Sequence, residues 1–506
     1  MKKSKISICL LPLVSLMALS SCGGQIIDPT IIAFKKENLV QSSFGGLGVE
    51  WGVYEDTDKL DERSRERIFE NIQRLNPSRI RCMINYDWFV TNFNDRGDED
   101  KTNDTWDYDF TNKMAANLDE ILSYCQSHKI EVAFGSWNVV GSLVDDKWNM
   151  MDDCTSDIRW AKISTFILDY LVNKKGYTCI RWFVNGNEPN YLGIKGLSKN
   201  WNNSFAKWAQ GVENVRKAFD DAGLNNIQIV GGDTTGLVGT KEYWTSIAKQ
   251  CAESVGDYGA HLYLSNYYID EGVLLEEIQN LNKDIHSIDR GYGSERPVNI
   301  WECGLLDGKD AETDSNLLIK TVTYGIRMAD FTLQSVLGGV NGLTYWSFDD
   351  AMNFIYTTNP ATPKRWGMFS SLTSDQPYDQ EVRPWFHSSC LLTNLLSPQS
   401  KVYASDIQDE EVKTFFRSIG VINEANNSGG FVAINRGSED ITKSYYLEQE
   451  INGSGKLYIY KFGEGQIRLN DQGFVKPNYV IDGSLNKKTE IEIPANSMVI
   501  VSSEEL

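Results

Sequence analysis

The sequence predicts an α/β fold: a (β/α)8 TIM barrel followed by a small C-terminal antiparallel β-sandwich. Over residues 44–396, eight short apolar stretches alternate with amphipathic ones, which is typical of a parallel sheet with right-handed crossovers. Eight strands close such a barrel, and about 350 residues suit a barrel with insertions. After residue 396 the pattern changes to short alternating runs rich in Thr, Val, Tyr and Ile.

The eight predicted strands have apolar, β-branched or aromatic centres and end at turn-forming residues. They are Gly46–Trp51, Ser78–Ile84, Ile130–Trp137, Ile180–Gly186, Ile227–Gly232, Tyr258–Leu264, Val298–Cys303 and Leu343–Phe348. The helices predicted between them are Asp61–Leu75, Asp109–Ser127, Ile158–Lys174, Ser204–Asp221, Val273–Asp289 and Asn316–Leu337. An open doubly wound sheet is the alternative, but no G-x-G-x-x-G turn opens a helix, which favours the barrel.

Residues 397–506 are predicted to form the antiparallel β-sandwich. Its predicted strands are Val412–Phe416, Gly430–Asn435, Lys456–Tyr460, Lys488–Ile493 and Ser497–Val501. Residues 22–43 form an N-terminal linker that contains a strand-like stretch, Ile26–Lys36. We expect this stretch to join the sandwich, so that both ends of the chain build the β-domain.

Residues 1–21 are predicted to be an export signal. Lys2, Lys3 and Lys5 give a basic start, and Ile6–Leu19 is apolar but too short to span a bilayer with charged flanks. Cys22 follows small residues, which resembles a bacterial lipoprotein signal and implies cleavage before Cys22 and its acylation. An ordinary signal peptide with an incidental cysteine is the alternative. We expect an exported protein held at the outer membrane by a lipid at Cys22.

The composition excludes several function classes. The formal net charge is −20, and an acidic protein repels phosphate backbones, so we expect no nucleic-acid partner. The nine cysteines include no C-x-x-C pair, and the acidic residues 94–100 lack the order of a calcium loop. No metal and no cofactor is therefore expected. The 14 Trp and 23 Tyr suit a protein that stacks on sugars, although core packing explains them equally well.

Two glutamates carry the prediction of function. Glu188 follows the fourth predicted strand in Asn187-Glu188-Pro189, and Glu302 ends the seventh. Barrel enzymes keep their catalytic groups at the C-terminal ends of the strands. Enzymes that cleave a glycosidic bond need at least a pair of carboxyl groups. The alternative for each glutamate is an ordinary loop or strand-end carboxylate.

This arrangement resembles glycoside hydrolase clan A, the (β/α)8 retaining glycosidases that include family 5 and its relatives. The resemblance covers about residues 44–396. It implies that Glu188 is the general acid/base, that Glu302 is the nucleophile, and that Asn187 donates a hydrogen bond to the 2-hydroxyl of the sugar. Cys303 stands where many relatives carry an aromatic residue, which leaves the subfamily open.

Other positions match the clan's pattern on strands two and six. His261 and Tyr263 resemble a His-x-Tyr motif whose tyrosine contacts the nucleophile, although His261 could also be an ordinary core histidine. Arg81 resembles the arginine near the nucleophile, but Arg79 competes for this role because residues two apart on a strand share a face. Arg81 and Tyr263 beside Glu302 would favour its charged form.

Aromatic residues near strand ends are expected to bind the sugar. Trp346 resembles the strand-eight tryptophan that lies under the reacting ring, and Trp137 is a further candidate. Trp51 and Tyr191 also fall near strand ends, with plain core packing as the alternative for each.

The sequence as a whole predicts a retaining β-glycoside hydrolase that acts on a poly- or oligosaccharide by double displacement, with an endo-acting β-glucanase as the first expectation. The alternatives are an exo-β-glycosidase on short oligosaccharides and a non-catalytic surface glycan-binding lipoprotein, which would not need both acids. The sugar, the linkage and the oligomeric state are not encoded in these motifs.

Overall fold

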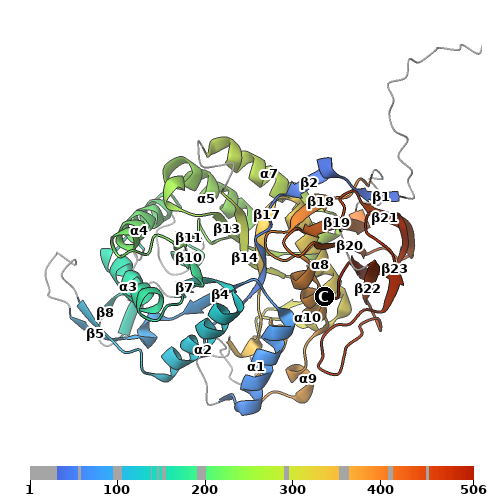
Figure 1. Ribbon diagram of the computed structural model, residues 1–506. Coiled ribbons are helices and arrows are strands. Elements are labelled where there is room, and N and C mark those ends of the chain that lie inside the picture. The colour runs from blue at the N-terminus through green and yellow to red at the C-terminus, as the bar shows by residue number, and fades with distance from the viewer. Residues whose placement is uncertain are drawn as a thin grey trace, which may run out of the picture.

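A curled, parallel nine-stranded sheet forms the centre of the computed structural model (Figure 1). The structure describes residues 31–54, 59–94, 105–137, 140–144, 147–150, 155–190, 201–289, 296–352, 364–407, 414–451 and 455–506. The sheet order is β11-β10-β7-β4-β3-β17-β14-β13-β12. Its strands are β3 (Gly46–Glu50), β4 (Arg79–Ile84), β7 (Glu131–Ser136), β10 (Ile180–Val184), β11 (Gln228–Ile229), β12 (Thr234–Thr235), β13 (Tyr258–Leu264), β14 (Val298–Leu305) and β17 (Val340–Tyr345).

The two edges of this sheet belong to one short stretch of chain. β11 pairs with β10, and β12, which follows it directly, pairs with β13. Between them, the amide of Val230 donates to Phe183 O (2.8 Å) on one side, while Gly231 O accepts from the amide of Gly259 (2.8 Å) on the other. This stretch therefore acts as strand five of a TIM-like barrel, so the predicted barrel is confirmed and the open doubly wound alternative is wrong.

Helices surround the sheet and cover its outer face (Figure 1). They are α1 (Glu62–Leu75), α2 (Lys113–His128), α3 (Ile158–Leu168) with a π-helical continuation (Asp169–Lys174), α4 (Trp201–Asp221), α5 (Leu237–Gln250), α7 (Val273–Ile288), α8 (Val322–Leu337) and α10 (Pro384–Leu395). α1 shows why they form: Asp61 caps it by accepting from Ser64 N (2.8 Å), and Ile68, Ile72 and Leu75 give it one buried stripe. Among the described residues, no helix is long and apolar enough to cross a membrane.

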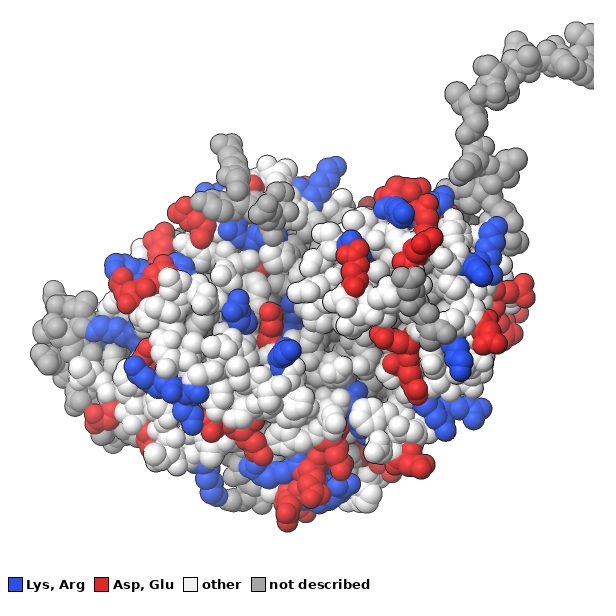
Figure 2. All heavy atoms as spheres, in the orientation of Figure 1, with Lys and Arg blue, Asp and Glu red and all other residues white. Residues whose placement is uncertain are grey.

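Several short elements lie outside the central sheet. They are the hairpins β5 (Val90–Asn94) with β6 (Thr105–Tyr108), β8 (Val140–Val144) with β9 (Lys147–Met150) and β15 (Lys309–Asp310) with β16 (Ser315–Asn316), the helices α6 (Asn266–Asp270) and α9 (Pro377–Gln380), and the 3-10 turns Lys36–Asn38, Tyr86–Trp88, Ala252–Ser254 and Leu317–Lys320. On the face shown in Figure 2, acidic and basic side chains are interspersed, so the acidic excess is spread over the described surface there.

The C-terminal region forms two further sheets beside the barrel (Figure 1). One has seven strands: β2 (Leu39–Gln41), β18 (Lys401–Ala404), β19 (Phe416–Asn423), β20 (Ser428–Asn435), β25 (Ser497–Ser502), β22 (Lys456–Phe462) and β23 (Tyr479–Asp482). The other has three: β1 (Ile31–Phe34), β21 (Ile441–Leu447) and β24 (Thr489–Ile493). The strand predicted at Val412–Phe416 begins instead at Phe416, and β2, β18, β21 and β23 were not predicted.

Both ends of the chain contribute to these sheets. β1 runs parallel to β21, with Phe34 opposite Leu447, and β2 pairs with β18. One apolar core includes Phe34 and Leu447 of the smaller sheet and Phe431 of the larger sheet. In this core the rings of Phe34 and Phe431 stack 5.8 Å apart. Residues 22–30, including part of the predicted strand Ile26–Lys36, lie outside the described residues.

Candidate active site

Glu188 and Glu302 face each other across His261 at the C-terminal ends of the barrel strands. Glu188 follows β10, Glu302 lies on β14 and His261 on β13. The Nδ1 atom of His261 is 2.9 Å from Glu188 Oε1 and 3.4 Å from Glu302 Oε2. One carboxylate oxygen of each glutamate and one ring nitrogen of His261 all lie within 4.8 Å of one another. The fold thus brings together two carboxyl groups that 114 residues separate in the sequence.

Both residues expected beside Glu302, Arg81 and Tyr263, donate hydrogen bonds to its carboxyl group. Arg81 Nη1 donates to Glu302 Oε1 (2.6 Å), and the Tyr263 hydroxyl donates to Oε2 (2.7 Å). Burial nevertheless raises the pKa of Glu302, and the charges of His261 and Arg81 and the Tyr263 hydrogen bond offset this only in part. Arg81 and Tyr263 thus favour the charged form of Glu302 as expected, but burial outweighs them because the side chain is only 6% exposed.

A β-bulge in β14 aims Glu302 into the site. Ala260 of β13 pairs with Ile300, whereas the next residue, His261, pairs with Glu302, so Trp301 is passed over. Trp301 packs inside the barrel, where its Nε1 donates to Asp257 Oδ2 (2.8 Å). Neighbouring strand residues normally point to opposite faces, and the bulge lets Trp301 and Glu302 both point inward.

Glu188 sits on a turn with a left-handed backbone. Its φ is 45°, which is uncommon for a non-glycine residue, and its amide donates to Asp233 O (3.2 Å). Asn187 accepts from Arg81 Nη2 (2.7 Å) through Oδ1, which directs its NH2 group away from the arginine. The Glu188 side chain is 22% exposed and that of Glu302 only 6%, so Glu188 is the more accessible of the two to solvent.

Two buried carboxyl groups in the site were missed by the sequence analysis. Asp233 accepts from Arg81 Nη2 (2.8 Å) and lies 2.8 Å from His261 Nε2, and Glu50 accepts from Arg81 Nη1 (3.0 Å). Glu50 ends β3 and Asp233 follows β11, so each is an acidic residue at the end of a predicted strand. The rule that selected Glu188 and Glu302 therefore also applies to them.

These two carboxyl groups differ in their protonation. Burial raises the pKa of Glu50 well above its usual range, and Arg81 offsets this only in part. Burial acts in the same direction on Asp233, but the charges of Arg81 and His261 outweigh it and lower the pKa of Asp233. Asp233 is therefore the permanent anion of the pair, while Glu50 tends to keep its proton.

His261 carries a positive charge in this setting. Burial alone would lower its pKa, but the charges of Asp233 and Glu302 and the hydrogen bonds to Asp233 and Glu188 raise it to about 10. Both ring nitrogens then carry protons, one directed at Asp233 and one at Glu188. The structure places His261 within the site and not in the apolar core.

The structure separates the two candidate arginines. Arg79 lies one layer deeper in the barrel, where it donates to Asn299 Oδ1 (2.9 Å) and to Gly45 O (3.1 Å) and packs over the Trp301 ring. Arg81 alone reaches the glutamates. It is fully buried and donates to Glu50, Asn187, Asp233 and Glu302.

The predicted aromatic residues divide between the site and the core. Trp137 lies beside Arg81, whose guanidinium carbon is 5.3 Å from its ring centre, and Trp346 meets Trp137 edge-on at 5.8 Å. Trp51 is fully buried among Phe69, Tyr124 and Phe348 on the outer side of the sheet, so its role is packing. Tyr191 and Cys22 lie outside the described residues.

The donor atoms of Glu188, His261 and Glu302 could in principle hold a metal ion. His261 Nδ1 already faces Glu188 at 2.9 Å, and the Arg81 cation lies 2.6 Å from Glu302. A divalent ion would have to displace the imidazole proton and approach a buried guanidinium. The same atoms suit proton transfer between carboxyl groups better.

Solved structures with a similar fold include glycoside hydrolases and an exported protein. A family 30 endoxylanase from Clostridium papyrosolvens C71 is 13% identical with a TM-score of 0.60, over 93% of this chain and 99% of that one. An endo-β1,6-glucanase is 15% identical with a TM-score of 0.60, over 95% and 94%. A conserved exported protein from Bacteroides fragilis is 13% identical with a TM-score of 0.62, over 93% and 100%.

At these identities the likeness concerns the fold, and the predicted resemblance to the clan A barrel is confirmed at that level. No protein-family model matches the sequence, and comparison with curated proteins finds no match.

Proposed function

We propose that the protein is a retaining β-glycoside hydrolase that cleaves a poly- or oligosaccharide by double displacement. The observation that carries the proposal is the separation of Glu188 and Glu302, whose nearest oxygens lie within 4.8 Å. Retaining glycosidases need carboxyl groups about 5–5.5 Å apart, whereas inverting ones leave about 6.5–9.5 Å for a water. The short separation therefore favours a covalent intermediate.

In the first step, a carboxylate oxygen of Glu302 attacks the anomeric carbon while the bond to the leaving oxygen breaks. Glu188 gives its proton to that oxygen, so the alcohol leaves neutral and Glu188 becomes a carboxylate. Arg81 and Tyr263 hold the two oxygens of Glu302, which fixes the attacking group before the substrate arrives.

In the second step, Glu188 takes a proton from water, and the hydroxide formed attacks the anomeric carbon of the glycosyl-enzyme. The ester bond breaks and Glu302 leaves as a carboxylate, so both residues return to their first state. His261 supports this exchange because its Nδ1 proton lies within reach of both glutamates. The product keeps the configuration of the substrate.

Asn187, Trp346 and Trp137 are proposed to bind the reacting sugar. The NH2 group of Asn187 points away from Arg81 and can donate to a 2-hydroxyl, while the two tryptophans offer faces for stacking. An endo-acting β-glucanase remains the first expectation, and the likeness to an endo-β1,6-glucanase supports it.

The location and the second domain are also proposals. Cys22 would carry the lipid of an outer-membrane lipoprotein. The likeness to an exported protein supports export of this chain and does not bear on the lipid. The two C-terminal sheets, with residues from both ends of the chain in one apolar core, would form the β-sandwich domain.

The decisive experiment follows the first product by proton NMR. The purified protein is incubated with a panel of β-glucans, xylans, mannans and galactans and with aryl β-glycosides, and the first anomer released is identified. We expect the β-anomer, and an α-anomer would overturn the retaining mechanism. Short early products would indicate exo action, and binding of a glycan without hydrolysis would favour the non-catalytic alternative.

A further inference from the structure

The chain after β17 folds back against the residue that holds Glu302. Trp366 is 4% exposed, and its ring meets the ring of Tyr263 edge-on at 5.8 Å. The Tyr263 hydroxyl in turn donates to Glu302 Oε2 (2.7 Å). A continuous line of contacts therefore runs from Trp366 through Tyr263 to the proposed nucleophile.

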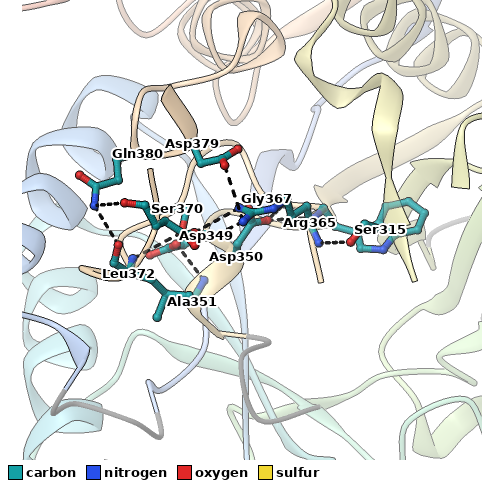
Figure 3. A network of polar contacts seen from close by, with 12 residues as sticks. Ser315, Asp349, Asp350, Ala351, Arg365, Gly367, Ser370, Leu372, Asp379 and Gln380 are labelled. Carbon is teal, nitrogen blue, oxygen red and sulfur yellow. Dashed lines mark hydrogen bonds and ion pairs between the residues drawn. The ribbon is translucent and has the colours of Figure 1, made fainter. Parts of the chain in front are cut away.

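A buried ion pair determines where Trp366 lies. Asp350 Oδ1 accepts from the amides of Trp366 (2.9 Å) and Gly367 (2.7 Å). Arg383 pairs with both oxygens of Asp350, with Nη1 3.2 Å from Oδ1, and also donates to Gly367 O. Asp350 and Arg383 are both buried, and Figure 3 shows Asp350 at the centre of a larger polar network.

Two glycines make this packing possible. A Cβ on Gly367 would lie 2.6 Å from the amide nitrogen of Asp350, so the two backbones touch directly. A Cβ on Gly304 would lie 3.3 Å from the Tyr263 ring and 3.4 Å from the Trp366 ring. Gly304 stands two residues after Glu302, which shows how tightly Trp366 and Tyr263 pack over this strand end.

We propose that the Asp350–Arg383 ion pair is a positioning unit for catalysis, which holds Trp366 against Tyr263 and thereby fixes the Tyr263 hydroxyl on Glu302. Neither charged residue contacts the glutamates; each acts through Trp366. Displacement of a reacting group by about 1 Å can cost about 10²-fold in rate. This proposal deepens the proposed glycosidase function and rests on it.

The outer part of the same network provides a matched control. Asp375 pairs with Arg365 (3.1 and 3.3 Å) and accepts from the Ser370 hydroxyl, and it does not accept from the Trp366 amide. Asp375→Asn and Asp350→Asn are the same chemical change in the same segment. Only the second removes charge from the acceptor of the Trp366 amide.

The experiment compares the two variants on an aryl β-glycoside. We expect Asp350→Asn to lower kcat about 10- to 100-fold with KM changed by less than about twofold, and Asp375→Asn to change kcat by less than about twofold. The Tyr263 hydrogen bond lowers the pKa of Glu302, so a loosened Tyr263 moves the acid limb of the kcat/KM profile to higher pH. Equal kcat values and unmoved acid limbs in the two variants would overturn the proposal.

A second pair of variants leaves the ion pair intact. Trp366→Leu should reproduce the loss of kcat, and Trp366→Phe should restore most of it, because a ring again packs on Tyr263. In a Tyr263→Phe background the effect of Trp366→Leu should disappear, since no hydroxyl remains to be positioned. Additive effects would overturn the proposal.

One measurement separates this proposal from the proposed function. The Trp366 indole N–H donates to Asp314 O (2.6 Å), and its hydrogen exchange can be followed by NMR without any substrate. Faster exchange in Asp350→Asn but not in Asp375→Asn supports the link from Asp350 to Trp366 even if the wild type hydrolyses none of the glycosides offered. Unchanged exchange would remove that link.

Discussion

Two charge networks, one in the active site and one between the barrel and the C-terminal sheets, balance their charges differently. At the junction, Asp330 of α8 accepts from Arg417 and from Arg436 (2.7 Å), and Asp270 accepts from Arg436 (2.7 Å) and Arg327 (3.0 Å). Two carboxylates therefore face three guanidinium groups. In the active site, four carboxyl groups surround one arginine and one histidine.

The difference shows what each network can do. Every cation at the junction is a guanidinium, which does not titrate in the physiological range, so that network only joins two parts of the molecule. The active site has more carboxyl groups than cations, and burial raises the pKa of Glu50 and of Glu302, which favours bound protons there. Glycosidic cleavage requires such a proton, and acids with divided protonation states are typical of catalytic sites.

The largest expected effect follows from removing an acid from the active site. Glu302→Gln should lower turnover by roughly 10⁴-fold or more, because no carboxylate remains to attack. Its thermal midpoint should stay equal to the wild type or rise, because the site loses one of its excess carboxyl groups. Calorimetry and aryl β-glycoside kinetics check both points, and wild-type turnover would end the nucleophile assignment.

Removing an acid from the junction should have the opposite consequence. Asp330→Asn leaves Arg417 and Arg436 buried with too little negative charge, which should cost about 3–5 kcal/mol of stability. Turnover per folded molecule should not change, because Asp330 pairs with Arg417 and Arg436 at the junction and with neither glutamate. Urea unfolding and kinetics at 25 °C test this prediction.

The exposed pair Lys217–Asp221, whose side chains are 77% and 68% exposed, provides the control for Asp330→Asn. Asp221→Asn should change stability by less than about 1 kcal/mol. A similar small cost for Asp330→Asn would show that the junction network is not effectively buried.

Most of the barrel could be predicted from the sequence, because its strands are apolar throughout and its helices carry one apolar stripe. Six of the eight predicted strands overlap an observed strand over most of their length. The eighth, Leu343–Phe348, shares only residues 343–345 with β17, and the fifth, Ile227–Gly232, is the short β11. It could not be delimited because this stretch divides its hydrogen bonds between two neighbours. β21 and β23 were missed because they lack a clear apolar face: β23 is largely exposed, and most side chains of β21 are only partly buried.

The site was predictable only in part, because chain order gives the strand and not the direction or depth of a side chain. Arg79 and Arg81 share a face, and only their depth in the barrel separates them. Glu50 and Trp51 are neighbours, so alternation allows only one of them to face the axis. That neighbour is Glu50, which explains why Trp51 is a core residue. The pKa of Glu302 depends on burial, which no motif reports.

The smallest expected effect is a change in stability that distinguishes Glu50 from Asp233, the two carboxyl groups beside Arg81 that were not predicted. Burial raises the pKa of Glu50, so at pH 6 it should be a neutral acid, and Glu50→Gln replaces one neutral group by another of the same shape. We expect its stability to be within about 1 kcal/mol of the wild type. Asp233→Asn removes a charge that Arg81 and His261 both need, and should cost about 3 kcal/mol or more.

The pH dependence gives the sign of the Glu50 effect. A carboxyl group with a raised pKa stabilises the fold fully at pH values below its ordinary pKa, and this stabilisation is lost as the pH rises through the raised value. The wild type should therefore lose stability relative to Glu50→Gln between about pH 5 and 9, by at most about 1.4 kcal/mol per pH unit. Parallel stability curves, or a cost at pH 6 equal to that of Asp233→Asn, would mean that Glu50 is ionised. The site would then hold one proton fewer than its geometry indicates.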